Sequence, residues 1–262
     1  MALTWAGKRQ LTVMGIIFGA ILIVASFYII PAVTKAPTCS DGVQNGTETG
    51  VDCGGKCPTF CAFEVTKPIV LWSQAFPVSD TVYNLAAYVE NQNTNAAVNS
   101  ISYNFKIYDS NYVFIAEHAG SAFIPPKGNF VIFDAGVYVG NRIPVHTKFE
   151  FTSSPNWLKV SQATMDKIPV LTVSDQDLTN VGTIPTLVAK VSNHSVYTVN
   201  DVAVVAILSG DDGNAIGVSQ TTIDTLNAND SKQIFFTWPK ALNGVVKKID
   251  IIPKFDYSSI KF

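Results

Sequence analysis

The chain has 262 residues, of which 47% are hydrophobic, 11% are aromatic and only 15% are charged, with a formal net charge of −2 at pH 7. This charge balance argues against a nucleic-acid-binding protein, because such proteins need a basic face to neutralise phosphates. The aromatic content excludes an intrinsically disordered chain, since disordered chains lack the side chains that build a core. The length suits one or two globular domains in addition to a targeting segment.

An uncharged apolar stretch occupies residues 11–30. A helix over this stretch would be about 30 Å long, which matches the hydrocarbon core of a bilayer. Lys8 and Arg9 precede it, so the positive-inside rule predicts a cytoplasmic tail over residues 1–10 and places the chain after Pro31 outside. A cleaved signal peptide is the alternative, but its apolar region is usually only about 7–15 residues long. We therefore predict a transmembrane signal anchor in the lipid bilayer of the cell membrane, ended by the proline.

Two small residues in the predicted anchor, Gly15 and Gly19, have the GxxxG spacing. This spacing lets two membrane helices approach closely, so it suggests a homo-oligomer with helix contacts at these glycines. The alternative is that both are simply small residues on a lipid-facing helix.

Residues 31–62 are predicted to form a Cys-rich collar that contains every cysteine of the chain: Cys39, Cys53, Cys57 and Cys61. An even number of clustered cysteines on the oxidising side of a membrane predicts two disulfides, and the sequence leaves three pairings open. Zinc is the alternative, but the x3 spacing of the last three differs from the C-x2-C pattern of zinc knuckles.

The collar also carries oxygen-bearing side chains beside glycines: Asp41, Asn45, Glu48 and Asp52. Hard oxygen donors of this kind suit Ca²⁺, which is the one cofactor that the sequence suggests. Their spacing differs from that of an EF-hand loop. The alternative is that these side chains cap turns within a small disulfide knot.

Residues 39–61 read CSDGVQNGTETGVDCGGKCPTFC. This segment resembles a recurring motif of secreted proteins, C-x-D-G-x-x-N-x-x-E-x-x-x-D-C-G-G-x-C. A chain with this motif behind a signal anchor and ahead of β-domains resembles uncharacterised single-pass envelope proteins of bacteria. The resemblance implies a location and an architecture, but no activity.

The chain after the collar has the pattern of strands and turns. Residues 101–107 alternate strictly between apolar and polar side chains, as a strand with one buried face does. Gly, Asn, Asp and Pro punctuate the chain at intervals typical of a β-sandwich. We therefore predict a mainly β fold after the membrane helix.

An internal repeat divides this β region into two copies. A shift of 102 residues overlays residues 85–133 on residues 187–235 without a gap. The apolar register is preserved, for example between Asn91 and Asn193 and their neighbours, although a slip of one residue would turn each core face outward. We predict two tandem immunoglobulin-like β-sandwiches over residues 63–160 and 169–262. A short linker over residues 161–168 suggests that they stack end to end.

The repeats are similar to the FxLYD and LEA14-like families of β-sandwiches, in segments such as VAKVSN (188–193) and NDVAVV (200–205). Members of these families are generally non-catalytic accessory modules. The resemblance therefore implies a binding or support role.

The search for catalytic motifs gives no match to nucleophile-elbow, zinc-protease or nucleotide-binding patterns. The three histidines, His118, His146 and His194, are far apart in the sequence. We expect no enzymatic activity. Aromatic residues such as Tyr112, Phe114 and Tyr138 could mark a binding face, and packing is the alternative explanation.

The sequence thus favours a membrane-anchored, extracytoplasmic module for binding, adhesion or scaffolding in the cell envelope. Its partner would be an envelope protein or a surface polymer. Two alternatives stay open: an accessory subunit of an envelope enzyme or secretion complex, and a Ca²⁺-dependent surface module.

Overall fold

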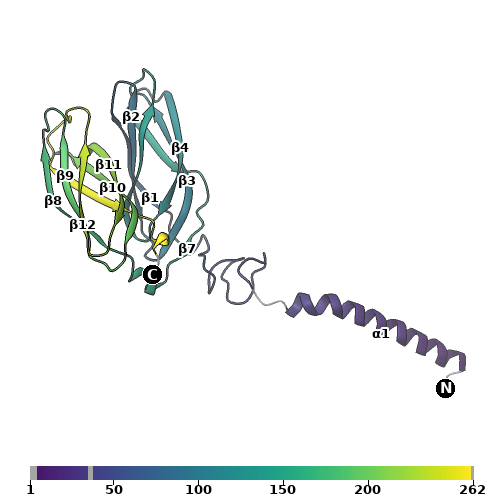
Figure 1. Cartoon of the computed structure of the whole chain (residues 1–262). Helices are drawn as coiled ribbons and strands as arrows, with labels where there is room; N and C mark the ends of the chain where they lie inside the picture. Colours follow the sequence, from purple (N-terminus) through teal and green to yellow (C-terminus); the bar gives the residue numbers. More distant parts are fainter. Residues whose placement is uncertain (1–4, 35–37, 261–262) are drawn as a thin grey trace.

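The structure is a computed structural model that describes residues 5–34 and 38–260. A long helix is followed by a small collar and then by two bodies built almost entirely of antiparallel strands (Figure 1). The mainly β fold class with one N-terminal apolar helix is therefore confirmed.

Helix α1 covers Trp5–Thr34 and projects away from the β region (Figure 1). Its segment Trp5–Ile30 has a mean hydropathy of 2.6, and no part of its most apolar window is buried inside the structure. This helix is long and apolar enough to cross a membrane. It starts before the apolar stretch and continues past Pro31, so the prediction that this proline ends it is wrong. Proline lacks an N–H and costs the helix a backbone hydrogen bond, yet the backbone keeps its helical path here.

The first sandwich consists of two antiparallel sheets, in the orders β1-β2-β5 and β4-β3-β6, with β7 beside the start of β3. The strands are β1 (Ile69–Pro77), β2 (Val82–Asn91), β3 (Ala96–Tyr108), β4 (Phe114–Ile124), β5 (Gly128–Tyr138), β6 (His146–Phe151) and β7 (Leu158–Lys159). Alternate side chains of the two sheets meet in one core, in which Leu85, Phe105 and Phe130 are fully buried. This packing follows from the period of two in the sequence.

The second sandwich follows a short helix, α2 (Gln162–Met165), whose N-cap Ser161 accepts a hydrogen bond from the Thr164 backbone N–H. Its strands are β8 (Leu171–Thr179), β9 (Thr186–Asn193), β10 (Val199–Ser209), β11 (Ala215–Leu226), β12 (Ser231–Thr237) and β13 (Lys248–Lys254), followed by the 3-10 turn η1 (Tyr257–Ser259). They form sheets in the orders β8-β9-β12 and β11-β10-β13. The strand order is the same as in the first sandwich, so the structure confirms two copies of one strand arrangement. The gapless register predicted at a shift of 102 residues is wrong in the third strand, because Phe105 faces the inner core whereas its counterpart Ile207 faces outward, toward the first sandwich.

The repeat extends to single turn positions. Lys127 and Asn229, which are 102 residues apart, both have left-handed backbones, with φ of 59° and 53°. The Lys127 N–H donates to the Asn93 carbonyl at 3.0 Å, and the Asn229 N–H donates to the Ser195 carbonyl at 3.1 Å. The two copies therefore close the loop between their fourth and fifth strands in the same way.

A fully buried asparagine ends the second strand of each copy. The Asn91 Nδ2 donates to the carbonyl oxygens of Ala96 and Pro125 at 2.9 and 2.8 Å. Its Oδ1 accepts a hydrogen bond from the Asn93 backbone N–H at 3.1 Å. One amide thereby joins the loop after β2 to the loop after β4, which belong to opposite sheets.

Asn193 performs the same task in the second copy. Its Nδ2 donates to the carbonyl oxygens of Tyr197 and Asn227 at 2.8 and 3.0 Å, and its Oδ1 accepts from the Ser195 N–H at 3.0 Å. A buried amide is stable only with such partners, because removing it from water without them is costly.

We predict that Asn91→Ala and Asn193→Ala each lower the free energy of unfolding by about 1–3 kcal/mol, because each leaves buried carbonyl oxygens without a donor. Chemical denaturation of the full chain in detergent measures this loss. Asn111→Ala, at an exposed turn position, is the matched control. A loss in the buried variants no greater than in the control would contradict the proposed role of these asparagines in joining the two sheets.

The two sandwiches lie side by side and not end to end, so the predicted stacking is wrong (Figure 1). The outer face of sheet β1-β2-β5 packs against the outer face of sheet β11-β10-β13, and we call this contact the seam. Its buried residues are Phe76, Ala86, Val131, Val205, Ile207, Ala215 and Val218. At one end of the seam, the Lys240 Nζ lies 2.9 Å from the Asp80 Oδ1.

The apolar pattern of two strands explains why the sandwiches lie side by side. The central strands at the seam are apolar on both faces, as in Leu85-Ala86-Ala87 of β2 and in Val202–Leu208 of β10. A continuous apolar run is typical of a strand that is covered on both sides, whereas strict alternation indicates one solvated face. Stacking end to end would leave these outer faces in water.

We predict that Ala86→Asp or Val205→Asp separates the two sandwiches, because each places an unpaired carboxylate in the apolar seam. Opening the seam returns the carboxylate to water and leaves both inner cores intact. Calorimetry of the full chain should therefore show two unfolding transitions in place of one. Ala119→Asp, on the exposed side of β4, should unfold like the wild type. A single unshifted transition in both seam variants would contradict the seam.

Candidate binding sites

The collar is closed by two disulfides, Cys39–Cys57 and Cys53–Cys61. The structure thus confirms two disulfides and selects one of the three pairings that the sequence allowed. Cys39, Glu48 and Cys57 bring potential metal-binding atoms within 4.8 Å of one another. Because two of these atoms are the sulfurs of one disulfide, they provide no thiolate for zinc.

Glycines shape the collar around these disulfides. Gly55 has a left-handed φ of 51°, and a Cβ there would lie 1.7 Å from the Thr47 carbonyl oxygen. A Cβ at Gly50 would lie 2.8 and 2.9 Å from the sulfurs of Cys61 and Cys53. The backbone at Gly50 therefore passes directly against the second disulfide, and the left-handed turn at Gly55 explains the glycine of the motif at that position.

The four oxygen-bearing side chains that were predicted as calcium ligands come together in one hydrogen-bond network. The Asp52 carboxylate accepts the backbone N–H groups of Asp41 and Gly42, each at 2.9 Å. The Glu48 Oε2 accepts those of Asn45 and Asp52 at 3.2 and 3.3 Å. These carboxylates therefore cap turns of the collar.

Asp41 completes the network. The Asn45 Nδ2 donates to its carboxylate at 3.0 Å, and this bond, with those from the Thr38 and Val43 backbones, lowers the pKa of Asp41. The Asn45 Oδ1 is buried, and no group of the described residues donates a hydrogen bond to it. Calcium binding by the collar remains a prediction.

We predict that Asp52→Ala loosens the collar, because two backbone N–H groups lose a charged acceptor that stabilises them by about 1–2 kcal/mol. Trypsin should then cleave the full chain faster after Lys56, whereas Val43→Ala, at a side chain that is 59% exposed, should leave the rate unchanged. If the network alone holds the collar, EDTA will not change the wild-type rate. Faster cleavage in EDTA, reversed by Ca²⁺, would support the calcium hypothesis instead.

The collar is joined firmly to the first sandwich. The Phe60 N–H donates to the Trp157 carbonyl at 2.8 Å, and the Lys159 N–H donates to the Pro58 carbonyl at 2.7 Å. The Lys159 Nζ donates to the Gly55 carbonyl at 2.8 Å and lies 5.1 Å from the centroid of the Phe60 ring. Trp157 is buried in the sandwich core. The collar thus continues the β-structure next to β7 and is not a free hinge.

Gly15 and Gly19 both lie on α1 with open space where a Cβ would be. This exposure is compatible with a second helix or with lipid, so the helix contact and the homo-oligomer remain predictions.

The three histidines lie in separate surroundings. The His118 Nε2 is 3.6 Å from the Asp134 Oδ2, the ring of His146 stacks on Tyr112 with centroids 4.0 Å apart, and the His194 Nε2 is 3.0 Å from the Thr172 Oγ1. The structure does not bring the three histidines together into one site.

The Asp134 carboxylate also accepts the hydroxyl of Tyr103 at 2.8 Å. Burial, reinforced by this carboxylate, raises the pKa of Tyr103. The phenol therefore stays protonated and serves as a donor. It connects β3 to β5, which belong to different sheets, so this cluster is explained by closure of the sandwich.

Exposed apolar residues gather at the end of the first sandwich that is far from the collar. β3 starts beside β7, next to the collar, and its 13 residues carry the chain about 40 Å to the opposite end. The loops there expose a set of residues that we call the tip patch: Tyr112, Phe114, Ile143 and Val145. Tyr112 is 70% exposed, and Tyr138 at the end of β5 is 69% exposed. Packing in the core therefore does not explain these aromatics.

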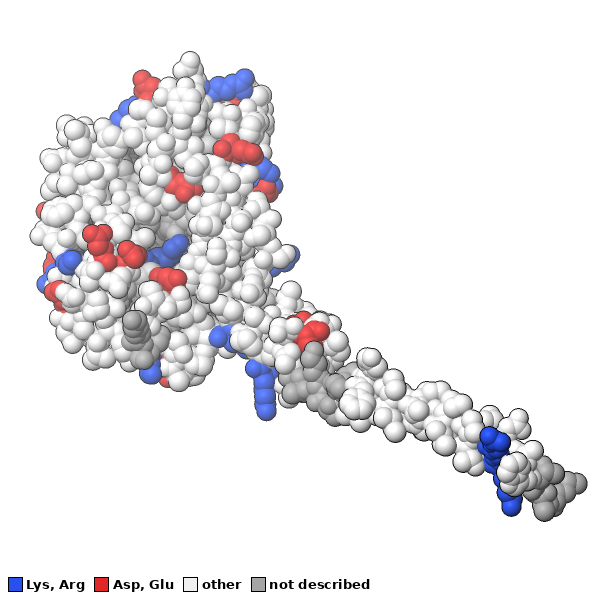
Figure 2. All heavy atoms as spheres, turned by 45° about the vertical axis from the view of Figure 1, so that its right-hand side comes forward, with Lys and Arg blue, Asp and Glu red and all other residues white. Residues whose placement is uncertain are grey.

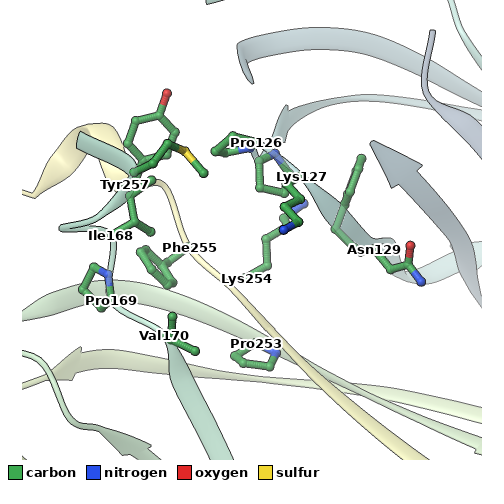
Figure 3. A pocket seen from close by; sticks show the side chains of 13 residues that line it. Pro126, Lys127, Asn129, Ile168, Pro169, Val170, Pro253, Lys254, Phe255 and Tyr257 are labelled. Carbon is green, nitrogen blue, oxygen red and sulfur yellow. The ribbon is translucent and has the colours of Figure 1, made fainter. Parts of the chain in front are cut away.

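A pocket of about 260 Å³ lies at the other end of the seam, between the sandwiches (Figure 3). Its walls come from the β4–β5 loop, the start of β5, the linker, and the segment from the end of β13 to η1. The lining residues are Pro125, Pro126, Lys127, Asn129, Phe130, Met165, Ile168, Pro169, Val170, Pro253, Lys254, Phe255 and Tyr257. Since these segments are far apart in the sequence, no local motif could have predicted the pocket.

Lys254 is the unusual residue of this pocket. Its Nζ lies 3.4 Å from the Val131 carbonyl oxygen and 5.4 Å from the centroid of the Phe130 ring. Among the described residues, no carboxylate forms an ion pair with it. Burial lowers the pKa of Lys254 to about 8, because the apolar surroundings disfavour the charged form.

Charged side chains are sparse and of mixed sign on the face of the β region shown in Figure 2. Basic side chains do not gather on this face into the continuous patch that is typical of nucleic-acid-binding proteins.

No family model and no curated protein matches this chain. Among solved structures, the chain is similar to red sea bream transglutaminase, with 12% sequence identity over 74% of this chain and a TM-score of 0.25. The match spans only 30% of that protein. A likeness at this TM-score supports no argument about fold or activity. The resemblance to FxLYD and LEA14-like domains therefore stays a prediction.

Proposed function

We propose that this protein is a non-catalytic binding and scaffolding module of the cell envelope, anchored in the membrane by α1. The observation that supports the proposal is that the collar and the two sandwiches are joined to one another by direct contacts. The collar is hydrogen-bonded to the first sandwich, and the seam joins that sandwich to the second. The tip patch is thus held at a fixed distance from the collar.

The orientation is part of the proposal. Lys8 and Arg9 lie in the first turns of α1, which supports a cytoplasmic N-terminus by the positive-inside rule. The two disulfides after the helix support an oxidising compartment on the other side. On this basis the sandwiches are extracytoplasmic.

The tip patch suits a protein partner with an apolar surface. Aromatic side chains are enriched at protein interfaces and contribute much of the binding energy there. A rigid support reduces the entropy that is lost when the partner binds. The function therefore consists of presenting this surface, with the remaining bulk of the two sandwiches acting as a stiff spacer.

We predict that protease added to intact cells removes the β region, including a tag at the C-terminus, while residues 1–10 stay protected. Immunoblotting of tags at both ends measures this. Reversed protection would contradict the proposed topology.

We also expect that crosslinking from the tip patch in intact cells captures an envelope protein, identified by mass spectrometry. The double variant Tyr112→Ser, Phe114→Ser should reduce this product at least about tenfold if both aromatics are hot spots. Phe235→Ser, at a residue that is 57% exposed on the second sandwich, is the matched control. Capture that is equal in all variants, or that yields only the chain itself, would contradict a protein partner at the tip.

A further inference from the structure

The pocket at the end of the seam has predominantly apolar walls. Four of its lining residues are prolines, and Met165, Ile168 and Phe255 add further apolar surface. Prolines are stiff, so these walls are held in place without a bound molecule. A small organic group would be desolvated here, as in most ligand pockets.

The charge of the pocket is one-sided. Lys127 and Lys254 both line it, whereas none of the described lining residues is an aspartate or a glutamate. The side chains of these two lysines extend into the pocket from opposite walls in Figure 3. The nearest described partners of the Lys254 Nζ are a carbonyl oxygen and an aromatic ring, which do not neutralise a cation. An anion in the pocket would supply the missing counter-charge.

We propose that this pocket binds a small organic acid, with its carboxylate paired to the Nζ of Lys254 and its apolar body against the proline and aromatic walls. The site is separate from the tip patch, so the inference does not depend on the proposed function.

The size and the charge define the ligand class. A volume of 260 Å³ lies just below the range of about 300–1,000 Å³ that is typical of drug-sized ligands, so the acid must be small. One partly desolvated ammonium matches a single carboxylate, whereas a phosphate dianion usually takes several charged or N–H donors. The apolar walls further favour an acid with a hydrocarbon or aromatic body over acetate.

Binding would act on the whole β region. The pocket is built from the first sandwich, the linker and the second sandwich, so it exists only while the seam is closed. A ligand that binds this closed arrangement stabilises it by mass action. The bound acid would therefore raise the temperature at which the β region unfolds.

The test uses the full chain in lipid nanodiscs and 3-phenylpropionate as the probe, measured by titration calorimetry. We expect saturable binding with a Kd of about 1 mM or tighter. The amide 3-phenylpropanamide has the same body without the charge, and acetate has the charge without the body. Both should bind at least about tenfold more weakly.

Three variants identify the group that binds. Lys254→Met should weaken binding at least about tenfold, while its melting temperature stays equal to or above that of the wild type, because the substitution removes a half-buried cation that has no carboxylate partner among the described residues. Lys127→Asn should weaken binding by about threefold at most, since Lys127 is exposed and an exposed charge contributes little. Asparagine occupies the equivalent turn position in the second copy, so this substitution suits the backbone. Lys232→Met, at an exposed position outside the pocket, should bind like the wild type.

Three results would overturn the proposal. They are equal binding of the acid and its amide, undiminished binding by Lys254→Met, and the absence of saturable binding to the wild type by both 3-phenylpropionate and hexanoate at about 10 mM. The higher or equal melting temperature of Lys254→Met ensures that lost binding is not a consequence of unfolding.

Discussion

The apolar seam between the two sandwiches is the constraint on which the rest of the structure depends. It fixes the second copy beside the first, and it thereby creates the pocket at one end and the Lys240–Asp80 ion pair at the other. The surface that it removes from water explains why β2 and β10 are apolar on both faces. Because the collar is tied to β7, this one contact also determines that the collar and both sandwiches behave as one body.

The seam requires two intact sandwiches, and the same hydrogen-bonded residue joins the two sheets of each sandwich. A buried asparagine, Asn91 or Asn193, links loops of opposite sheets at equivalent positions. The asparagine and its hydrogen bonds repeat at a shift of 102 residues, whereas β3 and β10 do not keep the same faces at that shift. Packing tolerates many apolar substitutions, whereas a buried amide with three partners does not. The hydrogen bonds explain why asparagine occupies both positions, and the identical neighbours Val89 and Val191 are core residues.

Much of the fold could be predicted from sequence periodicity. The apolar stretch predicted α1, the cysteine count predicted two disulfides, and the shift of 102 residues predicted equivalent strands up to single turn positions such as Lys127 and Asn229. These features follow from local patterns. The disulfide pairing, the seam and the pocket depend on how distant segments meet, which local patterns do not encode. The continuous apolar run of β10 was the sequence pattern that could have predicted the seam. No sequence pattern around Lys254 indicated the pocket.

The seam joins unlike surfaces. The first copy contributes its β1-β2-β5 sheet, whereas the second contributes β11-β10-β13, which corresponds to β4-β3-β6 of the first. Such a heterologous contact does not close on itself, so a third sandwich could in principle add at either end of the stack. The outer faces of the other two sheets prevent this, because both carry polar side chains. Asn104 and Lys106 lie on the outer face of β4-β3-β6, and Lys190 lies on that of β8-β9-β12. The two copies thus correspond to the two terminal, polar-faced repeats that close a repeat array.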